Sequence, residues 1–280
     1  MRLRLICTLA LAALAYGQSS PRIYNTVKTK LQEGKQVVGG TVSTYDPEIY
    51  CAMANAGFDF TWIEMQHSTL SYTQVANMIR FCKGASAMPF IRVPDATEGD
   101  IQKAMDLGAA GIIVPMVDTV EKIQNAVKFA NYPPKGVRSQ GGGQYGAMWG
   151  ADYRQISNDN LVVVAMIENP KGAAIADKIA AVPGVDVVFV ASTDLGSFSG
   201  FKQGQPEYEA LVDKIQSGVL GKGLKLGGPD AWRTTRKNYN FFQAAGEPQL
   251  IRMGATQVLK GTASSEGRRG VAPIEGSEKH

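Results

Sequence analysis

Four segments of the chain place polar side chains directly after an apolar run. These side chains are Glu64 with His67, Arg92, Glu168 and Asp194. An imidazole suits proton transfer near neutral pH, a guanidinium can grip a carboxylate or oxo group through paired hydrogen bonds, and carboxylates bind cations. If the apolar runs are parallel strands, the four segments end at one rim of the sheet, where ligands bind in parallel α/β folds.

The run before Glu168 is the most informative of the four. Apolar residues follow one another without interruption from Leu161 to Met166, which is typical of a strand buried on both faces of a parallel sheet. A carboxylate at the end of such a strand must be paired, hydrogen-bonded or bound to a cation, since leaving it alone costs on the order of several kcal/mol. The alternative is that Glu168 only caps the following helix, which opens with Asn169 and Pro170.

Glu168 and Asp194 together predict a site for a divalent cation. No cysteine or second histidine stands near either residue, and an all-oxygen set favours Mg²⁺ or Mn²⁺ over zinc. Two carboxylates leave coordination positions for water and substrate oxygens, and such an ion acts as a Lewis acid toward an enolate. His67 and Arg92 carry weaker signals, because a lone histidine is often structural and an arginine can equally hold a neighbouring loop.

Strand patterns and amphipathic helix patterns alternate along the chain. The predicted strands are residues 37–43, 58–65, 89–93, 111–117, 161–167, 185–191, 224–226 and 249–253. The predicted helices are residues 46–56, 71–84, 99–107, 120–130, 170–181, 207–217, 231–244 and 256–263. This order predicts a single-domain α/β fold, the closed (β/α)₈ TIM barrel. Residues 132–160 are too long for a plain connection, and long loops in compact domains are usually functional.

Composition and the chain ends set the domain boundaries. The chain has 280 residues, 44% hydrophobic, which suits one barrel, and its net charge of +4 comes from scattered residues, so we expect no nucleic-acid partner. Residues 1–17 have the basic start, short apolar run and small residues of a signal peptide. We therefore expect a secreted protein with no membrane segment after cleavage, a barrel over residues 18–265 and a flexible tail over residues 266–280.

Two cysteines, Cys51 and Cys82, remain after removal of the signal peptide. Both fall in predicted neighbouring helices, and an oxidising compartment permits a disulfide between them. A bridge of this loop length would contribute about 3–4 kcal/mol in the chain-entropy model. Two unlinked buried thiols are the alternative.

Several longer motifs carry a family resemblance. They are GFDFTWIEMQHS from residue 57, PFIRVP from residue 89, DIQKAMDLGAAGIIVPMVDTVE from residue 100, NYPPKGVRS from residue 131, and the later IE and TDL. In these motifs the chain resembles the HpcH/HpaI aldolase family of the phosphoenolpyruvate/pyruvate superfamily, over about residues 39–261. That family includes class II pyruvate aldolases and the fungal macrophomate synthase.

The resemblance implies a role for each matching position. Glu168 and Asp194 correspond to the metal ligands, and Arg92 to the residue that binds the substrate oxo group and enolate. His67 corresponds to the base, and Asp106 to the acid that orients it. The amides of Thr193 and Asp194, where a short helix is expected to begin, would hold the pyruvate carboxylate. The segment with Arg138 and Ser139 resembles one that borders the site.

The chain also departs from the family pattern. Glu64 stands where the aldolases usually have Asp, and Gln66 where they often have Glu. Ser192 and Thr193 replace a usual Pro-Ala. Met166 occupies a substrate-binding position that commonly holds Gln, and this loss removes a polar contact of about 1–3 kcal/mol if its partner stays buried. The departures leave the choice of oxo acid and aldehyde open.

The leading hypothesis is therefore a metal-dependent carbon–carbon lyase that cleaves or forms 2-oxo acids through a pyruvate enolate. One alternative is decarboxylation with C–C bond formation in secondary metabolism, as in macrophomate synthase, and another is a secreted barrel that binds an oxo acid without turnover. The resemblance also implies a homo-oligomer. The apolar pair Met148-Trp149 in the long loop would then lie in an interface or, alternatively, in the substrate pocket.

Overall fold

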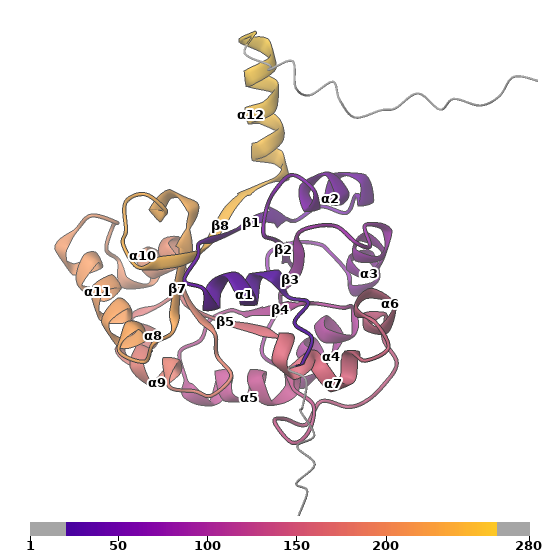
Figure 1. Ribbon diagram of the computed structural model, residues 1–280. Helices are drawn as coiled ribbons and strands as arrows, with labels where there is room; N and C mark the ends of the chain where they lie inside the picture. The colour runs from indigo at the N-terminus through magenta and orange to yellow at the C-terminus, as the bar shows by residue number, and fades with distance from the viewer. Residues whose placement is uncertain (1–20, 262–280) are drawn as a thin grey trace, which may run out of the picture.

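A closed eight-stranded parallel barrel ringed by helices forms the body of the computed structural model, which describes residues 21–261 (Figure 1). The strands are β1 (Val37–Val42), β2 (Phe60–Glu64), β3 (Met88–Arg92), β4 (Gly111–Val114), β5 (Val162–Ile167), β6 (Val187–Val190), β7 (Lys225–Pro229) and β8 (Tyr239–Gly246). They pair in chain order, and β8 closes on β1. The predicted TIM barrel is confirmed. The expected signal peptide and tail lie outside the described residues.

Helices cover the outside of the barrel and one of its ends. They are α1 (Thr26–Gln32), α2 (Pro47–Ala54), α3 (Tyr72–Phe81), α4 (Glu98–Asp106), α5 (Val120–Ala130), α6 (Tyr145–Trp149), α7 (Tyr153–Asn160), α8 (Pro170–Ala174), α9 (Ala176–Ala180), α10 (Ser192–Ser199), α11 (Pro206–Leu220), the 3₁₀ turn Asp230–Trp232 and α12 (Glu247–Leu259). Side-chain caps such as Ser71, Thr97 and Thr119 begin these helices by accepting first-turn N–H groups. Within residues 21–261 no helix is long and apolar enough to cross a bilayer.

The end of the chain differs from the expectation. The closing strand is β8, which overlaps the second half of the segment predicted as helix 231–244, and the segment predicted as strand 249–253 lies in α12. Phe241 and Phe242 explain the outcome, because both are fully buried on opposite faces of β8. The barrel needs an eighth strand to pair the free edges of β1 and β7, and this tertiary demand outweighs the helical pattern.

Alternation along the strands divides the core into two layers. Aromatic side chains fill the barrel interior, namely Phe60, Trp62, Phe90, Phe189 and Phe241. Glycines on neighbouring strands make room for them: a Cβ at Gly39 would lie 2.1 Å from the ring of Phe60, and one at Gly111 would lie 2.4 Å from Phe90. The other faces of the strands pack against the helices. Because the interior is filled, only the two barrel ends can hold ligands.

The amino end of the barrel is closed by α1 and by the long loop before β5. Val27 and Leu31 of α1 join the interior cluster, and Figure 1 shows α1 lying across the barrel. In the long loop, Trp149 stacks on Tyr24 with ring centroids 4.5 Å apart and donates to Gly108 O. Met148 and Trp149 are thus partly covered by their own chain at this end. The expected placement in the substrate pocket is wrong, because the pair lies at the end of the barrel opposite the carboxyl ends of the strands, whereas the placement in an interface stays a prediction.

A disulfide joins Cys51 of α2 to Cys82 at the end of α3, with Cα atoms 5.3 Å apart. The alternative of two unlinked thiols is excluded in this structure. The bridge ties together two outer helices whose strands, β1 and β2, are neighbours in the barrel.

Candidate active site

The carboxyl rim of the barrel gathers the charged residues that the sequence nominates. Phe60, Trp62 and Glu64 face inward in turn along β2, and Met88, Phe90 and Arg92 do so along β3. Glu64 and Arg92 are partners in the β2–β3 register, which puts them side by side. Glu168 follows β5 by one residue and lies two residues after the inward-facing Met166. Alternation thus delivers all three charged groups to the mouth of the barrel.

Arg92 lies at the centre of this group. Its Nη1 is 3.2 Å from Glu64 Oε2 and its Nη2 is 3.4 Å from Glu168 Oε1. The three side chains are only 7%, 8% and 2% exposed, respectively, so the charges interact with little solvent screening. Arg92 Nε is buried and has no hydrogen-bond partner among the described residues. A guanidinium has five N–H donors, so Arg92 keeps donors for a bound oxo group or carboxylate.

Glu64 fixes both Arg92 and the chain that carries His67. Its Oε1 accepts from the backbone N–H groups of Gln66 and His67, at 2.8 and 3.0 Å. Its Oε2 accepts from Trp62 Nε1 at 3.2 Å and from Arg92. The His67 side chain is exposed at the rim, and its ring makes no hydrogen bond within residues 21–261. Glu64 therefore positions both Arg92 and the backbone that carries His67.

Glu168 is buried close to Asp194 on the next strand connection. Burial raises the pKa of Glu168, and the neighbouring Asp194 carboxylate raises it further, whereas the Met116 N–H and Arg92 act to lower it. Met116 donates to Glu168 Oε1 at 2.9 Å from a backbone with φ of 53°, a left-handed conformation that is uncommon outside glycine. Met116 could not be identified from the sequence, since its role rests on its backbone N–H group. A cation between the two carboxylates would offset their mutual repulsion.

The short helix α10 begins at the residues expected to hold a carboxylate. Thr193 is exposed and Asp194 half-buried in its first turn, and no side chain caps this turn. The first amides of a helix have no partner within it, so those of Thr193 and Asp194 point outward as donors for an anion. Met166 is 2% exposed and lies on the interior face below Glu168.

Asp106 does not orient His67 within this chain, contrary to the expectation. It ends α4, close to the amino end of β4, whereas His67 follows the carboxyl end of β2. Its carboxylate binds Arg138 Nη2 at 2.8 Å and Gln102 Nε2 at 2.9 Å. Because each helix of the barrel runs back to the opposite end, a residue at the end of α4 lies away from the catalytic rim.

The segment with Arg138 lies at the same end as Asp106, so it does not border this rim within one chain. The Arg138 side chain is fully buried between the rings of Tyr132 and Tyr153, its guanidinium carbon 4.5 and 5.5 Å from their centroids. It fastens the long loop to α4, which is a structural role in the chain.

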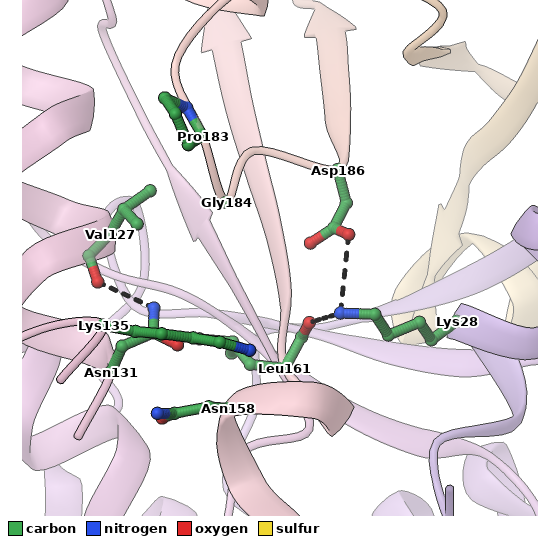
Figure 2. A pocket seen from close by; sticks show the side chains of 9 residues that line it. All are labelled: Lys28, Val127, Asn131, Lys135, Asn158, Leu161, Pro183, Gly184 and Asp186. Atoms are coloured by element: carbon green, nitrogen blue, oxygen red, sulfur yellow. Dashed lines mark hydrogen bonds and ion pairs between the residues drawn. The ribbon is translucent and has the colours of Figure 1, made fainter. Parts of the chain in front are cut away.

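A separate cavity of about 470 Å³ opens near the amino ends of β5 and β6. Figure 2 shows Lys28 and Lys135 entering it from opposite sides toward Leu161. Lys28 donates to Leu161 O at 2.7 Å and lies 3.6 Å from Asp186, and Lys135 pairs with Asp159 at 2.7 Å. Burial raises the pKa of Asp186. None of the residues that the sequence nominates lines this cavity, so we place the chemistry at the carboxyl rim.

Comparison with known proteins gives consistent matches. Residues 42–224 match the family model described as HpcH/HpaI aldolase/citrate lyase. The chain is 30% identical over 244 residues to a hydroxypyruvate/pyruvate aldolase from Rhizorhabdus wittichii, covering 84% of this chain and 97% of the relative. A crystal structure of an HpcH/HpaI aldolase/citrate lyase family protein from Burkholderia cenocepacia has a TM-score of 0.76 at 25% identity, covering 86% of this chain and all (100%) of the other. Macrophomate synthase has a TM-score of 0.73 at 21% identity, covering 89% and 92%, and shares the fold.

Proposed function

The chain belongs to the HpcH/HpaI aldolase/citrate lyase family, and we propose that it is a divalent-metal-dependent lyase that cleaves or forms 2-oxo acids through the enolate of pyruvate. It is an enzyme of the carbon–carbon lyase class, because the relatives that it matches over most of their length are aldolases. The observation that carries the finer proposal is the convergence of Arg92, Glu168 and Asp194 at the carboxyl rim.

The donor set at the rim fits an oxygen-preferring ion. Glu168 and Asp194 supply two carboxylates, and burial together with their proximity disfavours the charged form of Glu168 unless a cation is present. Among the residues described, no group of three or more His, Cys, Asp or Glu side chains is placed to hold a metal ion, so water and substrate oxygens would complete the coordination of Mg²⁺ or Mn²⁺. When bound, the ion supplies Lewis acidity toward the oxo group.

Separate residues of the chain bind the substrate, stabilise the enolate and transfer the proton. Arg92 binds the oxo oxygen and stabilises the negative charge that develops there in the enolate, using donors not committed to Glu64 and Glu168. The free amides of Thr193 and Asp194 hold the carboxylate of the 2-oxo acid. His67, exposed at the rim on a backbone fixed by Glu64, accepts the proton of the hydroxyl group as the C–C bond breaks.

A screen of 2-oxo acids with and without divalent metal tests this proposal. We expect 4-hydroxy-2-oxo acids to release pyruvate in the presence of Mg²⁺ or Mn²⁺ and to be inert in chelator. Decarboxylation of oxaloacetate coupled to C–C bond formation, without aldol cleavage, would favour the macrophomate synthase-like alternative. Binding of oxalate without turnover of any substrate would favour a non-catalytic barrel and contradict the proposal.

We also propose that the chain acts outside the cell. The supporting observation is the Cys51–Cys82 disulfide, because such bridges persist in oxidising compartments. The predicted signal peptide at residues 1–17 agrees with this location.

A homo-oligomer remains our proposal for assembly, and the exposed helix α12 supports it. Figure 1 shows α12 standing away from the barrel, and Ile251, Met253 and Val258 are each more than half exposed. Glu247 anchors its first turn by accepting from the backbone and hydroxyl groups of Ser43 and Thr44. An apolar groove lies beside this anchor and is lined by α2 residues such as Met53. We propose that it binds α12 of a second copy of the chain.

Replacing Ile251 and Val258 together with Asp is expected to give a monomer, because charges on the apolar side of α12 cannot be buried in a partner's groove. Light scattering at micromolar concentration measures the mass, and circular dichroism checks that the barrel remains folded. Thr256→Ala, on the same exposed helix, is the matched control and should stay oligomeric. A monomeric wild-type protein would contradict the assembly proposal.

A further inference from the structure

The wall of the barrel mouth formed by β1 and β8 carries a polar pair that none of the roles above uses. Thr41 is in register with the inward-facing Trp62, and Gln243 follows the inward-facing Phe241 by two residues. Gln243 is also in register with Gly39, whose position faces the ring of Phe60 in the interior. Both side chains therefore point into the mouth near its floor, and both are half-buried.

The hydrogen bonds of this pair fix the orientation of the Gln243 amide. Thr41 Oγ1 donates its single proton to Ala244 O at 2.8 Å. Only its lone pairs remain, so it accepts from Gln243 Nε2 at 3.2 Å. The amide oxygen of Gln243 is then turned away from Thr41, and it has no partner within the described part of the chain. A fixed acceptor thus faces the mouth.

Among the described residues of the neighbouring walls, one other amide oxygen lacks a partner, Gln66 Oε1 after β2, but this atom is buried from solvent and so is closed to a substrate. Met166 on β5 and Ala191 after β6 belong to the apolar interior cluster, and Pro229 is the register partner of Gln243 on β7. Arg92 on the far side of the mouth is a donor, and Glu64 is committed to Arg92 and to backbone amides. A substrate hydroxyl that enters the mouth on the β1–β8 side therefore finds one well-placed acceptor, the oxygen of Gln243.

From this geometry, and resting on the proposed lyase function, we propose that Gln243 selects a 2-hydroxyaldehyde as the partner of the pyruvate enolate, in preference to an alkyl aldehyde. In the bond-forming direction the enolate carbon attacks the aldehyde carbon, and the carbonyl π pair moves to the aldehyde oxygen, which takes a proton. The second hydroxyl of the aldehyde is not consumed. It donates to Gln243 Oε1 and orients the carbonyl toward the enolate.

Glycolaldehyde and propanal test the proposal, because they have the same number of heavy atoms and differ by a hydroxyl in place of a methyl. The wild-type enzyme is expected to prefer glycolaldehyde in kcat/KM for aldol addition to pyruvate. Gln243→Met keeps the length of the side chain but removes the acceptor, and should reduce this preference about tenfold, the usual value of one hydrogen bond. Gln243→Glu restores an acceptor and should recover a preference for glycolaldehyde.

Asn240→Ala is the matched control on the same strand, because Asn240 binds Gly34 O outside the mouth. It should leave the ratio of the two aldehydes unchanged. Exchange of the methyl protons of pyruvate in deuterated buffer with Mg²⁺ or Mn²⁺ reports on enolate formation in the wild-type enzyme without any aldehyde. Exchange with an unchanged ratio in Gln243→Met would overturn the role of Gln243 alone. Lack of exchange would overturn the proposed function, and this inference with it.

Discussion

Glu168→Gln and Asp194→Asn are each expected to abolish turnover and the thermal stabilisation of the protein by divalent ions. Either change removes one of the two carboxylates that converge at the rim, and a neutral amide is a much weaker ligand for Mg²⁺ or Mn²⁺. The loss in Glu168→Gln should be nearly complete, because Glu168 also holds Arg92 and the Met116 amide in place. Activity assays with added metal, and melting curves with and without metal, measure both effects.

Asp118→Asn provides the control for this experiment. Asp118 lies between β4 and α5 and pairs with Lys171, so it is an acid near the carboxyl ends of the strands that we assign no ligand role. It should keep metal-dependent turnover and stabilisation. Full turnover in chelator by Glu168→Gln or Asp194→Asn would refute the metal assignment, whatever the control shows.

Arg92→Lys and His67→Ala are expected to damage catalysis while the protein still binds metal. The guanidinium of Arg92 spans Glu64 and Glu168 at once and keeps a buried Nε free, and a single ammonium cannot reproduce this fork. For His67→Ala we expect the rate of aldol cleavage to fall by a factor of about 10²–10⁴, which is the usual contribution of general acid–base catalysis. Steady-state kinetics of pyruvate release, with metal-dependent melting in parallel, separates the two roles from ion binding.

Arg80→Lys tests whether any arginine-to-lysine change on this scaffold is harmful. Arg80 lies on α3 and binds the Gln144 side chain at 3.1 Å on the surface. Its replacement should leave the kinetics close to those of the wild type. Wild-type kinetics in Arg92→Lys would show that Arg92 is not the clamp for the oxo group, and an active His67→Ala would remove the histidine from proton transfer.

Much of the scaffold and part of the candidate site could be predicted from the sequence, because the signals are local. Apolar strand patterns predicted the first seven strands, and capping residues such as Ser71 and Thr119 predicted where helices begin. Arg92 and Glu168 were found without coordinates because each stands at the end of an apolar run, and parallel strands end at one rim. These features depend on neighbours in the chain, and the barrel topology then brings the strand ends to one rim.

Other features were decided only by the tertiary structure. The closing strand β8 is selected by the free edges of β1 and β7. Because this segment was predicted as a helix, Gln243 was not recognised as a residue at the carboxyl end of a strand. Asp106 matches a family position but lies at the end of α4, where Arg138 neutralises it. Several contacts depend on distances between segments that are remote in the chain. They are the Cys51–Cys82 disulfide, the hydrogen bond that covers Trp149, and the contact of Glu64 with Arg92. Such distances follow from how the whole barrel packs, which no local pattern encodes.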